Sequence, residues 1–254
     1  MKRWTVNQAK KEKENDQLNF NSNELKQKNR NNCGNILYSC DGAGILSKVF
    51  GPNLDAPDYL ANLSVNENQV IIGALFEFTM AVLIIGIVIW MYPILNKHNE
   101  TLALGFVLAR TIEVVIFTIG VISLLTLLTI SQEFVKAGAP DASYFQTLGT
   151  LLLAVREWGG GVCSTIVFGL SALMLNYILY QSKLIPRWIS GWGLIGAILY
   201  LASGFLPLFG YGSRSTIYGL MELPLGVQEM VFAVWLIVKG FNPSAIASGS
   251  AKQI

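Results

Sequence analysis

Residues 70–93, VIIGALFEFTMAVLIIGIVIWMYP, contain a single charged side chain, Glu77. The hydrocarbon core of a bilayer is about 30 Å thick and takes roughly 20 apolar residues in a helix, because lipid offers no partner for an unpaired backbone group. This stretch therefore predicts a transmembrane helix. Four more spans are predicted on the same grounds, at residues 102–130, 160–181, 188–209 and 217–238.

The composition of the whole chain agrees with these spans. Of its 254 residues 52% are hydrophobic and only 13% are charged, with a mean hydropathy of +0.48. These values exclude a water-soluble globule. They predict an all-α polytopic transmembrane helix bundle whose main partner is the lipid bilayer.

Charge and metal-binding residues exclude other classes of function. The net charge is +2, and residues 1–31 hold eight of the 18 Lys/Arg, so the membrane domain has no basic surface for a nucleic acid. Three cysteines and one histidine, His98, do not supply a disulfide framework or a His/Cys metal site. We expect no metal, no cofactor and no nucleic-acid partner.

The distribution of basic residues in the loops favours six spans over five. One side of the membrane holds Lys97, Lys183, Arg187, Lys239 and Lys252, and the other holds Lys136 and Arg214. The positive-inside rule places the first group in the cytoplasm, and five spans then leave the basic N-terminal tail outside. A sixth span at residues 32–50 brings both termini into the cytoplasm, as expected for a multi-pass protein of the inner (plasma) membrane.

Residues 32–50, NCGNILYSCDGAGILSKVF, are a degraded version of such a span, because Asn32, Asn35, Asp41 and several glycines interrupt it. One hypothesis is a shifted reading frame: with suitable codons, reading one base later converts residues 31–41 into the apolar IIAGIFYIAAT. The alternative is that the freedom among synonymous codons produces this match by chance. Sequencing the gene around codons 30–43 distinguishes the two.

The remaining segments predict three regions. Residues 1–31 are polar and predict a disordered tail, residues 32–240 form the membrane domain, and residues 241–254 predict a short flexible tail. In the external loop that follows residue 50, APDYLANL (56–63) predicts a short helix. Residues 143–158 are too short to cross, so they either extend the third long helix or lie at the interface.

Charged residues inside the spans are the functional pointers, because each costs about 2.5 to 3.5 kcal/mol on insertion scales. Arg110 and Glu113 are three apart on one helix and predict an ion pair. Glu77, on the preceding antiparallel helix, is closest in depth to Glu113. We therefore expect Glu77, Arg110 and Glu113 to form one cluster.

A second polar group lies in the later spans. Arg156 and Glu157 precede Gly159–Gly161, and Glu222 and Glu229 are two turns apart on one face of the last span. A face with two carboxylates needs a cation, which Arg156, Arg110, a transported proton or a metal ion would supply. The motif GWGLIG (191–196) has the dinucleotide-binding spacing but follows no strand, so Gly191, Gly193, Gly196 and Gly204 predict a small-residue stripe for helix packing.

Four segments of the chain form a specific combination: AGILSKVF (43–50), YPILNKHNETLALGFVLARTIEVV (92–115), YQSKLIPRWISGWGLIG (180–196) and ELPLGVQEMVFAVWLIVKGF (222–241). Together they resemble the bacterial membrane family called domain of unknown function 4386. The resemblance covers about residues 43–240 and departs at residues 31–42. It implies a six-helix integral membrane protein with an apolar first helix and no established activity, and it brings no catalytic residue.

The sequence thus predicts a non-enzymatic membrane protein, since it contains no HExxH, nucleophile elbow or P-loop and no histidine inside a span. The leading hypothesis is a structural or scaffold role in which ion pairs hold the bundle together. The alternative is a small-solute or proton-coupled transporter that uses Glu77, Glu113, Glu222 and Glu229. A homo-oligomer and an unknown membrane partner are both compatible with the sequence.

Overall fold

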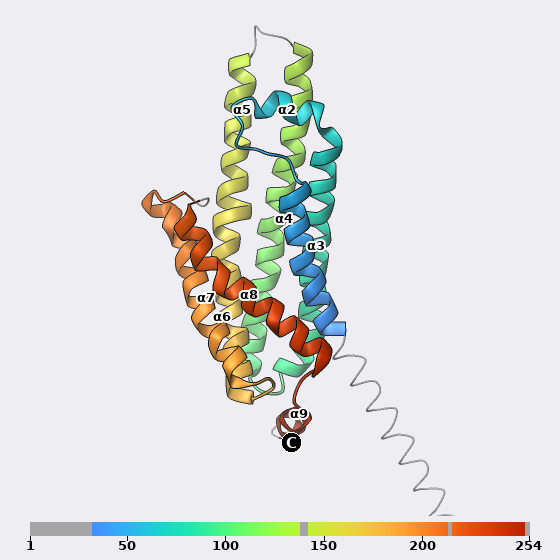
Figure 1. Ribbon diagram of the computed structural model, residues 1–254, viewed down its shortest axis with the longest axis vertical. Helices are drawn as coiled ribbons and strands as arrows, with labels where there is room; N and C mark the ends of the chain where they lie inside the picture. Colours follow the sequence, from blue (N-terminus) through green and yellow to red (C-terminus); the bar gives the residue numbers. More distant parts are fainter. Residues whose placement is uncertain (1–31, 138–141, 213–214, 252–254) are drawn as a thin grey trace, which may run out of the picture.

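The computed structural model describes residues 32–137, 142–212 and 215–251, which form helices joined by short connections (Figure 1). These ranges contain no strand, so the fold is an all-α bundle. The predicted disordered tail, residues 1–31, lies outside them, as do Arg214 and Lys252. After a helix at 32–50, the elements are α2 (Tyr59–Val65), α3 (Glu67–Leu95), α4 (Glu100–Ala137), α5 (Ala142–Val155), the π-helix η2 (Arg156–Cys163), α6 (Ser164–Ser182), α7 (Arg187–Phe205), the 3₁₀-helix η3 (Leu206–Phe209), α8 (Thr216–Val238) and α9 (Pro243–Ala251).

Five of the described helices are long and apolar enough to cross a membrane. They are Glu67–Leu95, Glu100–Ala137, Ser143–Ser182, Arg187–Phe209 and Thr216–Val238. Each contains one of the five spans predicted from the sequence, so that prediction is confirmed. The structure is that of a multi-pass membrane protein.

The outer surface of α3 shows why such helices need lipid. Large apolar side chains are exposed along one face of this helix at spacings of three and four residues: Ile71, Leu75, Phe78, Val82, Ile85 and Ile89. Soluble proteins rarely expose an apolar patch of this length. The opposite face, which includes Ala81, Ile84 and Ile87, is buried in the bundle.

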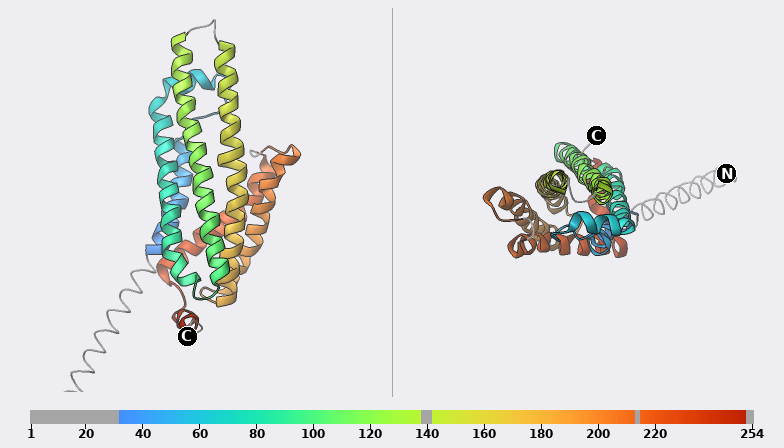
Figure 2. Two further views of the ribbon diagram at one scale, coloured as in Figure 1. Left: turned by 180° about the vertical axis from the view of Figure 1, so that it is seen from behind. Right: turned by 90° about the horizontal axis from the view of Figure 1, so that it is seen from above.

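Residues 143–158 extend the third long helix. Ser143–Ser182 form one rod of 40 residues, about 60 Å long, in which the π-helical turn η2 joins α5 to α6. Of the two alternatives, the extension is therefore correct and the interfacial segment is not. The rod lies beside α4, which has 38 residues (Figure 2).

The helix at residues 32–50 is the sixth long element, although its composition is too polar for it to count among the apolar spans. Cys33, Leu37 and Cys40 repeat at helical spacing and are buried in the main hydrophobic cluster. A Cβ atom added to Gly34 would lie 2.9 Å from the backbone oxygen of Ala233, so this glycine lets α8 cross closely. The small residues that make the segment a poor lipid-facing helix thus suit it to a packed position.

Glycines also bring α7 against its neighbours. A Cβ atom on Gly196 would lie 3.0 Å from the Cα atom of Leu225 in α8, and one on Gly204 would lie 2.8 Å from Ile166 in α6. The predicted packing stripe is present at these two positions and at Gly193. Gly191 contributes only an ordinary contact with Tyr180.

Short helices cover both ends of the bundle. The predicted helix in APDYLANL is present as α2, and its Leu60 carbonyl accepts a hydrogen bond from the Ser131 hydroxyl of α4. At the other end, the sequence predicts a flexible tail from residue 241, whereas Pro243–Ala251 form α9 and Phe241 is buried against Phe232. The aromatic contact anchors this part of the tail, which sequence polarity alone did not indicate.

Candidate functional site: two ion-pair clusters and a polar cleft

Glu77 of α3 pairs with Arg156, the first residue of η2. The Arg156 Nη2 atom lies 2.5 Å from Glu77 Oε1, and Nη1 lies 3.2 Å from Oε2, so the contact is bidentate. Ser47 Oγ donates a further hydrogen bond of 3.1 Å to Oε1. This two-point geometry is the strong form of an arginine–carboxylate interaction.

The local fold around Arg156 depends on glycine. In η2 the Cα atom of Gly160 meets Gly120 of α4 so closely that a Cβ atom on either residue would lie about 3 Å from the other's Cα. This contact brings Arg156 Nη1 within 2.7 Å of the Gly120 carbonyl oxygen, to which it donates. A π-helical turn inside a longer α-helix is often found at functional sites, because it re-aims side chains.

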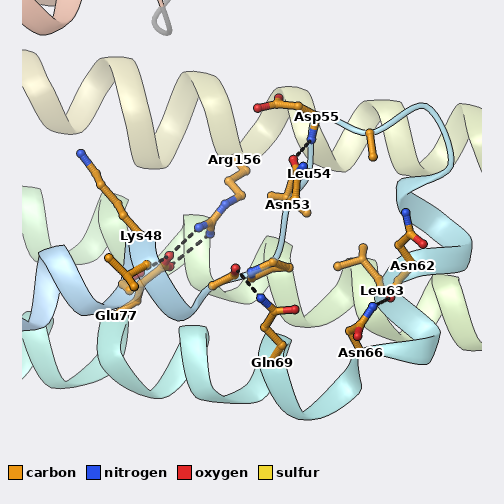
Figure 3. Close-up of a pocket in the computed structure, with 15 residues that line it drawn as sticks. Lys48, Asn53, Leu54, Asp55, Asn62, Leu63, Asn66, Gln69, Glu77 and Arg156 are labelled. Carbon is orange, nitrogen blue, oxygen red and sulfur yellow. Dashed lines mark hydrogen bonds and ion pairs between the residues drawn. The ribbon is translucent and has the colours of Figure 1, made fainter.

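The pair lies at the inner end of a polar cleft of about 720 Å³ (Figure 3). Its walls come from the end of helix 32–50, the following loop, α2, α3 and η2, so the cleft lies toward the end of the bundle where α2 lies. The polar side chains on its walls are Ser47, Lys48, Asn53, Asp55, Asn62, Asn66, Gln69, Glu77 and Arg156. Glu77 lies seven residues beyond Val70, so the cleft reaches about 10 Å into the apolar part of α3.

Arg110 forms a separate and more enclosed cluster. Its Nη1 atom lies 3.1 Å from Glu113 Oε2, as the spacing predicts, and its Nη2 atom lies 3.6 Å from Glu229 Oε1 of α8. The rings of Phe106 and Phe168 flank the guanidinium at 5.8 and 4.5 Å. Arg110 is only 4% exposed, whereas the Glu229 side chain is 15% exposed, so the cation is the most enclosed member of this cluster.

The expected grouping of Glu77 with Arg110 and Glu113 is therefore wrong. Residue depth along antiparallel helices was the basis of that grouping, but depth does not say which way a side chain points. Glu77 faces η2, whereas Arg110 and Glu113 face α8. Of the two arginines considered for the face with Glu222 and Glu229, Arg110 is the one that contacts Glu229.

Asp41, on the helix at 32–50, belongs to the Arg110 cluster and was missed from the sequence. It is close enough to Arg110 and Glu229 to interact with both electrostatically. Its buried Oδ2 atom has no hydrogen-bond partner among the described residues. An aspartate inside a predicted span indicates a polar partner in the bundle, but in the sequence Asp41 was interpreted only as a residue that interrupts the span.

The other predicted residues, Glu157 and Glu222, form no ion pair with Arg110 or Arg156. Glu222 of α8 faces the hydroxyl groups of Tyr218 and Tyr200 and interacts electrostatically with Lys48. Glu157 is half-buried, follows Arg156 in the chain and interacts electrostatically with Tyr218. Glu222 and Glu229 therefore share a helix face but not a cation.

With this geometry in place, comparison with known proteins identifies the family. A family model described as "Domain of unknown function (DUF4386)" matches residues 36–240. The chain belongs to this family. The DUF4386 chain is also 28% identical to an uncharacterized protein of Archaeoglobus fulgidus over 83 residues, which are 33% of this chain and 48% of that relative. The chain thus covers about half of the relative's length, and no solved structure matches.

The family match contains both ion-pair clusters of this DUF4386 protein. It begins at residue 36, so it includes Asp41 and most of the helix at 32–50. The expected start near residue 43 is therefore too late by seven positions. The polar residues of that stretch obscured the similarity, although the face of the helix that packs in the core is apolar.

A buried amide contact completes the polar interior of the DUF4386 bundle, and sequence analysis also missed it. Asn176 of α6 and Gln228 of α8 are 3% and 1% exposed, and Gln228 Nε2 lies 3.3 Å from Asn176 Oδ1. Gly193 of α7 leaves the space that Asn176 occupies. Within the described residues, no group of three or more His, Cys, Asp or Glu side chains is placed to hold a metal ion.

Proposed function

We propose that this DUF4386 protein is a non-enzymatic membrane protein that binds a small polar solute in the cleft at Glu77 and Arg156. The observation that carries the proposal is the position of this ion pair at the inner end of a polar cavity of about 720 Å³. Charged groups inside a membrane domain are typically directed at a partner or at a water-filled pathway. Glu77 and Arg156 pair with each other and also line the cleft.

The chemistry of the cleft favours a solute with an anionic group. The Arg156 side chain is 24% exposed although its partner Glu77 is only 10% exposed, so the cation is the more accessible member of the pair. A guanidinium binds planar carboxylates and phosphates by two parallel hydrogen bonds. A carboxylate-bearing solute would compete with Glu77 for Arg156, and Lys48 on the cleft wall adds positive charge.

The structural hypothesis applies to the Arg110 cluster. Arg110 joins α4 to α8 through Glu113 and Glu229, and the flanking phenylalanine rings close it off. A closed ion pair fixes the position of two helices without offering a surface to a ligand. We propose that this cluster holds the bundle together while the Glu77–Arg156 cleft binds the solute.

We further propose that the protein resides in the inner (plasma) membrane with both termini in the cytoplasm. The α3–α4 connection, the α6–α7 connection and the C-terminal end of α8 lie at the end of the bundle where the helix at 32–50 begins and α9 lies (Figure 1). These segments carry Lys97, Lys183, Arg187 and Lys239. This concentration of basic residues favours the cytoplasmic side for that end. The cleft then opens on the opposite, external side.

Water access to the cleft is tested by thiol labelling in the full chain. In a variant that lacks the three native cysteines, Ser47→Cys lies beside Glu77 in the cleft, and Ile85→Cys lies on the lipid-facing side of α3 as the matched control. We expect a membrane-impermeant maleimide to label residue 47 in intact cells and to leave residue 85 unlabelled. An unlabelled residue 47 contradicts the proposal.

Solute binding is tested by thermal unfolding of the purified protein with glycine, succinate, glucose and choline as separate probes. Saturation at about 100 times Kd stabilises a protein by about 2.7 kcal/mol. We expect succinate to raise the Tm of the wild type and of Glu133→Gln, a surface control, but not of Arg156→Lys, because lysine does not reproduce the two-point contact. If no probe raises the Tm, or if the shift persists in Arg156→Lys, the proposed solute site is wrong.

A further inference from the structure

The Arg110 cluster contains more negative than positive charge. Three helices contribute to it: the helix at 32–50 with Asp41, α4 with Arg110 and Glu113, and α8 with Glu229. One guanidinium faces three carboxyl groups. If all three were ionised, the cluster would carry a formal charge of −2 in the interior of a membrane domain, where uncompensated charge is costly.

Among the described residues, none of the groups that interact with the cluster supplies the missing positive charge. These groups are Cys40 beside Asp41, Tyr200 of α7 and, farther along α8, Glu222, which has Lys48 as its own cation. From α6 comes the ring of Phe168, which covers the guanidinium. Glu113 is 6% exposed, so solvent ions do not approach it freely.

Two buried polar atoms show that the contacts in the cluster are incomplete. Arg110 is 4% exposed, and its Nε–H group has no acceptor among the described residues. Asp41 Oδ2 has no donor there either. Buried polar groups normally have hydrogen-bond partners, and a protonated carboxyl group beside Asp41 would supply the donor that Oδ2 lacks.

The three carboxyl groups are not equivalent. Both oxygens of Glu113 lie within 3.3 Å of Arg110 Nη1, so this carboxylate is fully paired. Glu229 has a single, longer contact of 3.6 Å with Arg110, and Asp41 adds a like charge close to it. Two neighbouring carboxyl groups that compete for one cation are typically not both ionised.

We propose that the Arg110 cluster is a proton-binding site in which Asp41 and Glu229 share one exchangeable proton at neutral pH, while Glu113 is the ionised partner of Arg110. The proton supplies a donor between the two carboxyl groups and reduces the charge of the cluster from −2 to −1. This site is distinct from the Glu77–Arg156 cleft. Its ligand is the proton itself, and its existence does not depend on a solute.

Infrared spectroscopy of the full chain in liposomes tests this site directly, because a protonated carboxyl group has a C=O stretching band that an ionised one lacks. We expect such a band at neutral pH, and we expect it to shift in D₂O because the proton exchanges. Glu229→Gln and Asp41→Asn should each remove the band, since the remaining acid is then ionised beside Arg110. Glu133→Gln, on the surface, should leave it unchanged.

Each outcome decides the proposal. Loss of the band in every variant that folds supports it, so a failure of one variant to fold leaves the other to decide, whereas loss in only one of two folded variants contradicts a shared proton. A band of the same intensity in wild type, Glu229→Gln and Asp41→Asn overturns it, as does the absence of any band that exchanges in D₂O. Because no solute is added, failure of the solute assays leaves this result unaffected.

Discussion

Two arginines with similar partners occupy different settings in this bundle. Arg110 is 4% exposed and is covered by two phenylalanine rings, whereas the Arg156 side chain is 24% exposed and faces a cleft. Loss of a cation is most costly where the carboxylates left behind are kept from water. The two positions should therefore differ in their effect on stability.

We expect Arg110→Met to lower the free energy of unfolding by about 3 to 5 kcal/mol, because it leaves buried acids without their cation. Arg156→Met should cost about 1.5 to 3 kcal/mol, the range for one charged hydrogen-bonded group, because water reaches Glu77 through the cleft. Unfolding in mixed micelles with increasing SDS measures both. The matched control is Lys136→Met, whose exposed pair with Glu133 contributes about 0 to 1 kcal/mol. Equal losses at Arg110 and Arg156 would contradict the difference in burial.

At this scale the sequence predicts contacts within one helix better than contacts between helices. Arg110 and Glu113 are three residues apart, so helix geometry alone brings them together. The partner of Glu77 is 79 positions away on η2, and it depends on the rotation of three helices about their axes. No spacing rule contains that information.

At the scale of elements, glycines set how closely the helices approach, and two of them offer a controlled comparison. Gly159 and Gly160 are adjacent in η2, but only Gly160 packs against Gly120 of α4, while a Cβ atom on Gly159 would meet nothing within 4 Å. The pair therefore separates the effect of a lost close contact from the effect of replacing glycine in a helix.

We expect Gly160→Ala to destabilise the protein by about 1 to 3 kcal/mol, because the new methyl group forces α4 and η2 apart and pulls Arg156 from the Gly120 carbonyl. Gly159→Ala should be neutral or stabilising by up to about 1 kcal/mol, since alanine has the higher helix propensity. Unfolding in SDS compares the two. The opposite order would show that the contact between Gly120 and Gly160 does not hold the two helices together.

The helix at 32–50 can be tested through its own thiol. Cys33 is 1% exposed in the wild type, next to the crossing of Gly34 over α8. In a Cys163→Ser background, Gly34→Leu should separate this helix from α8 and make Cys33 reactive toward maleimide. Gly42→Leu, at a position with nothing within 4 Å, is the control and should leave Cys33 protected. Labelling of Cys33 in the control would show that this helix does not pack as described.

The long apolar spans are predictable from hydropathy because lipid imposes a minimum length, whereas the helix at 32–50 was predicted only from the distribution of basic residues. Leu37 and Ala43 are buried by neighbouring helices and not by lipid. A window average over this segment is lowered by the polar residues on its outer side, such as Asn35 and Ser39. The sequence therefore indicated that a sixth span was needed, but it did not show that neighbouring helices bury the apolar face of this span.

For the whole molecule, the basic residues and the order of the helices predict one orientation in the membrane. Glu100, at the start of α4, and Asp58, before α2, are exposed at opposite ends of the bundle. In a variant without native cysteines, Glu100→Cys should be protected from an impermeant maleimide in intact cells and labelled after lysis. Asp58→Cys should be labelled in both. The reverse pattern would invert the proposed orientation and place the mouth of the cleft in the cytoplasm.

The lengths of α4 and of the rod Ser143–Ser182 have a consequence for the host membrane. These two helical segments, about 57 and 60 Å long, far exceed the roughly 30 Å thickness of the hydrocarbon core, so part of each extends beyond the acyl chains. The Ser131 hydroxyl donates a hydrogen bond to α2, so α2 and the cleft wall that it forms are attached to the C-terminal part of α4. The depth of Arg156 below the membrane surface, and with it the access of water to this residue, then depends on bilayer thickness. A thicker membrane should exclude water from the cavity, and a thinner one should admit it.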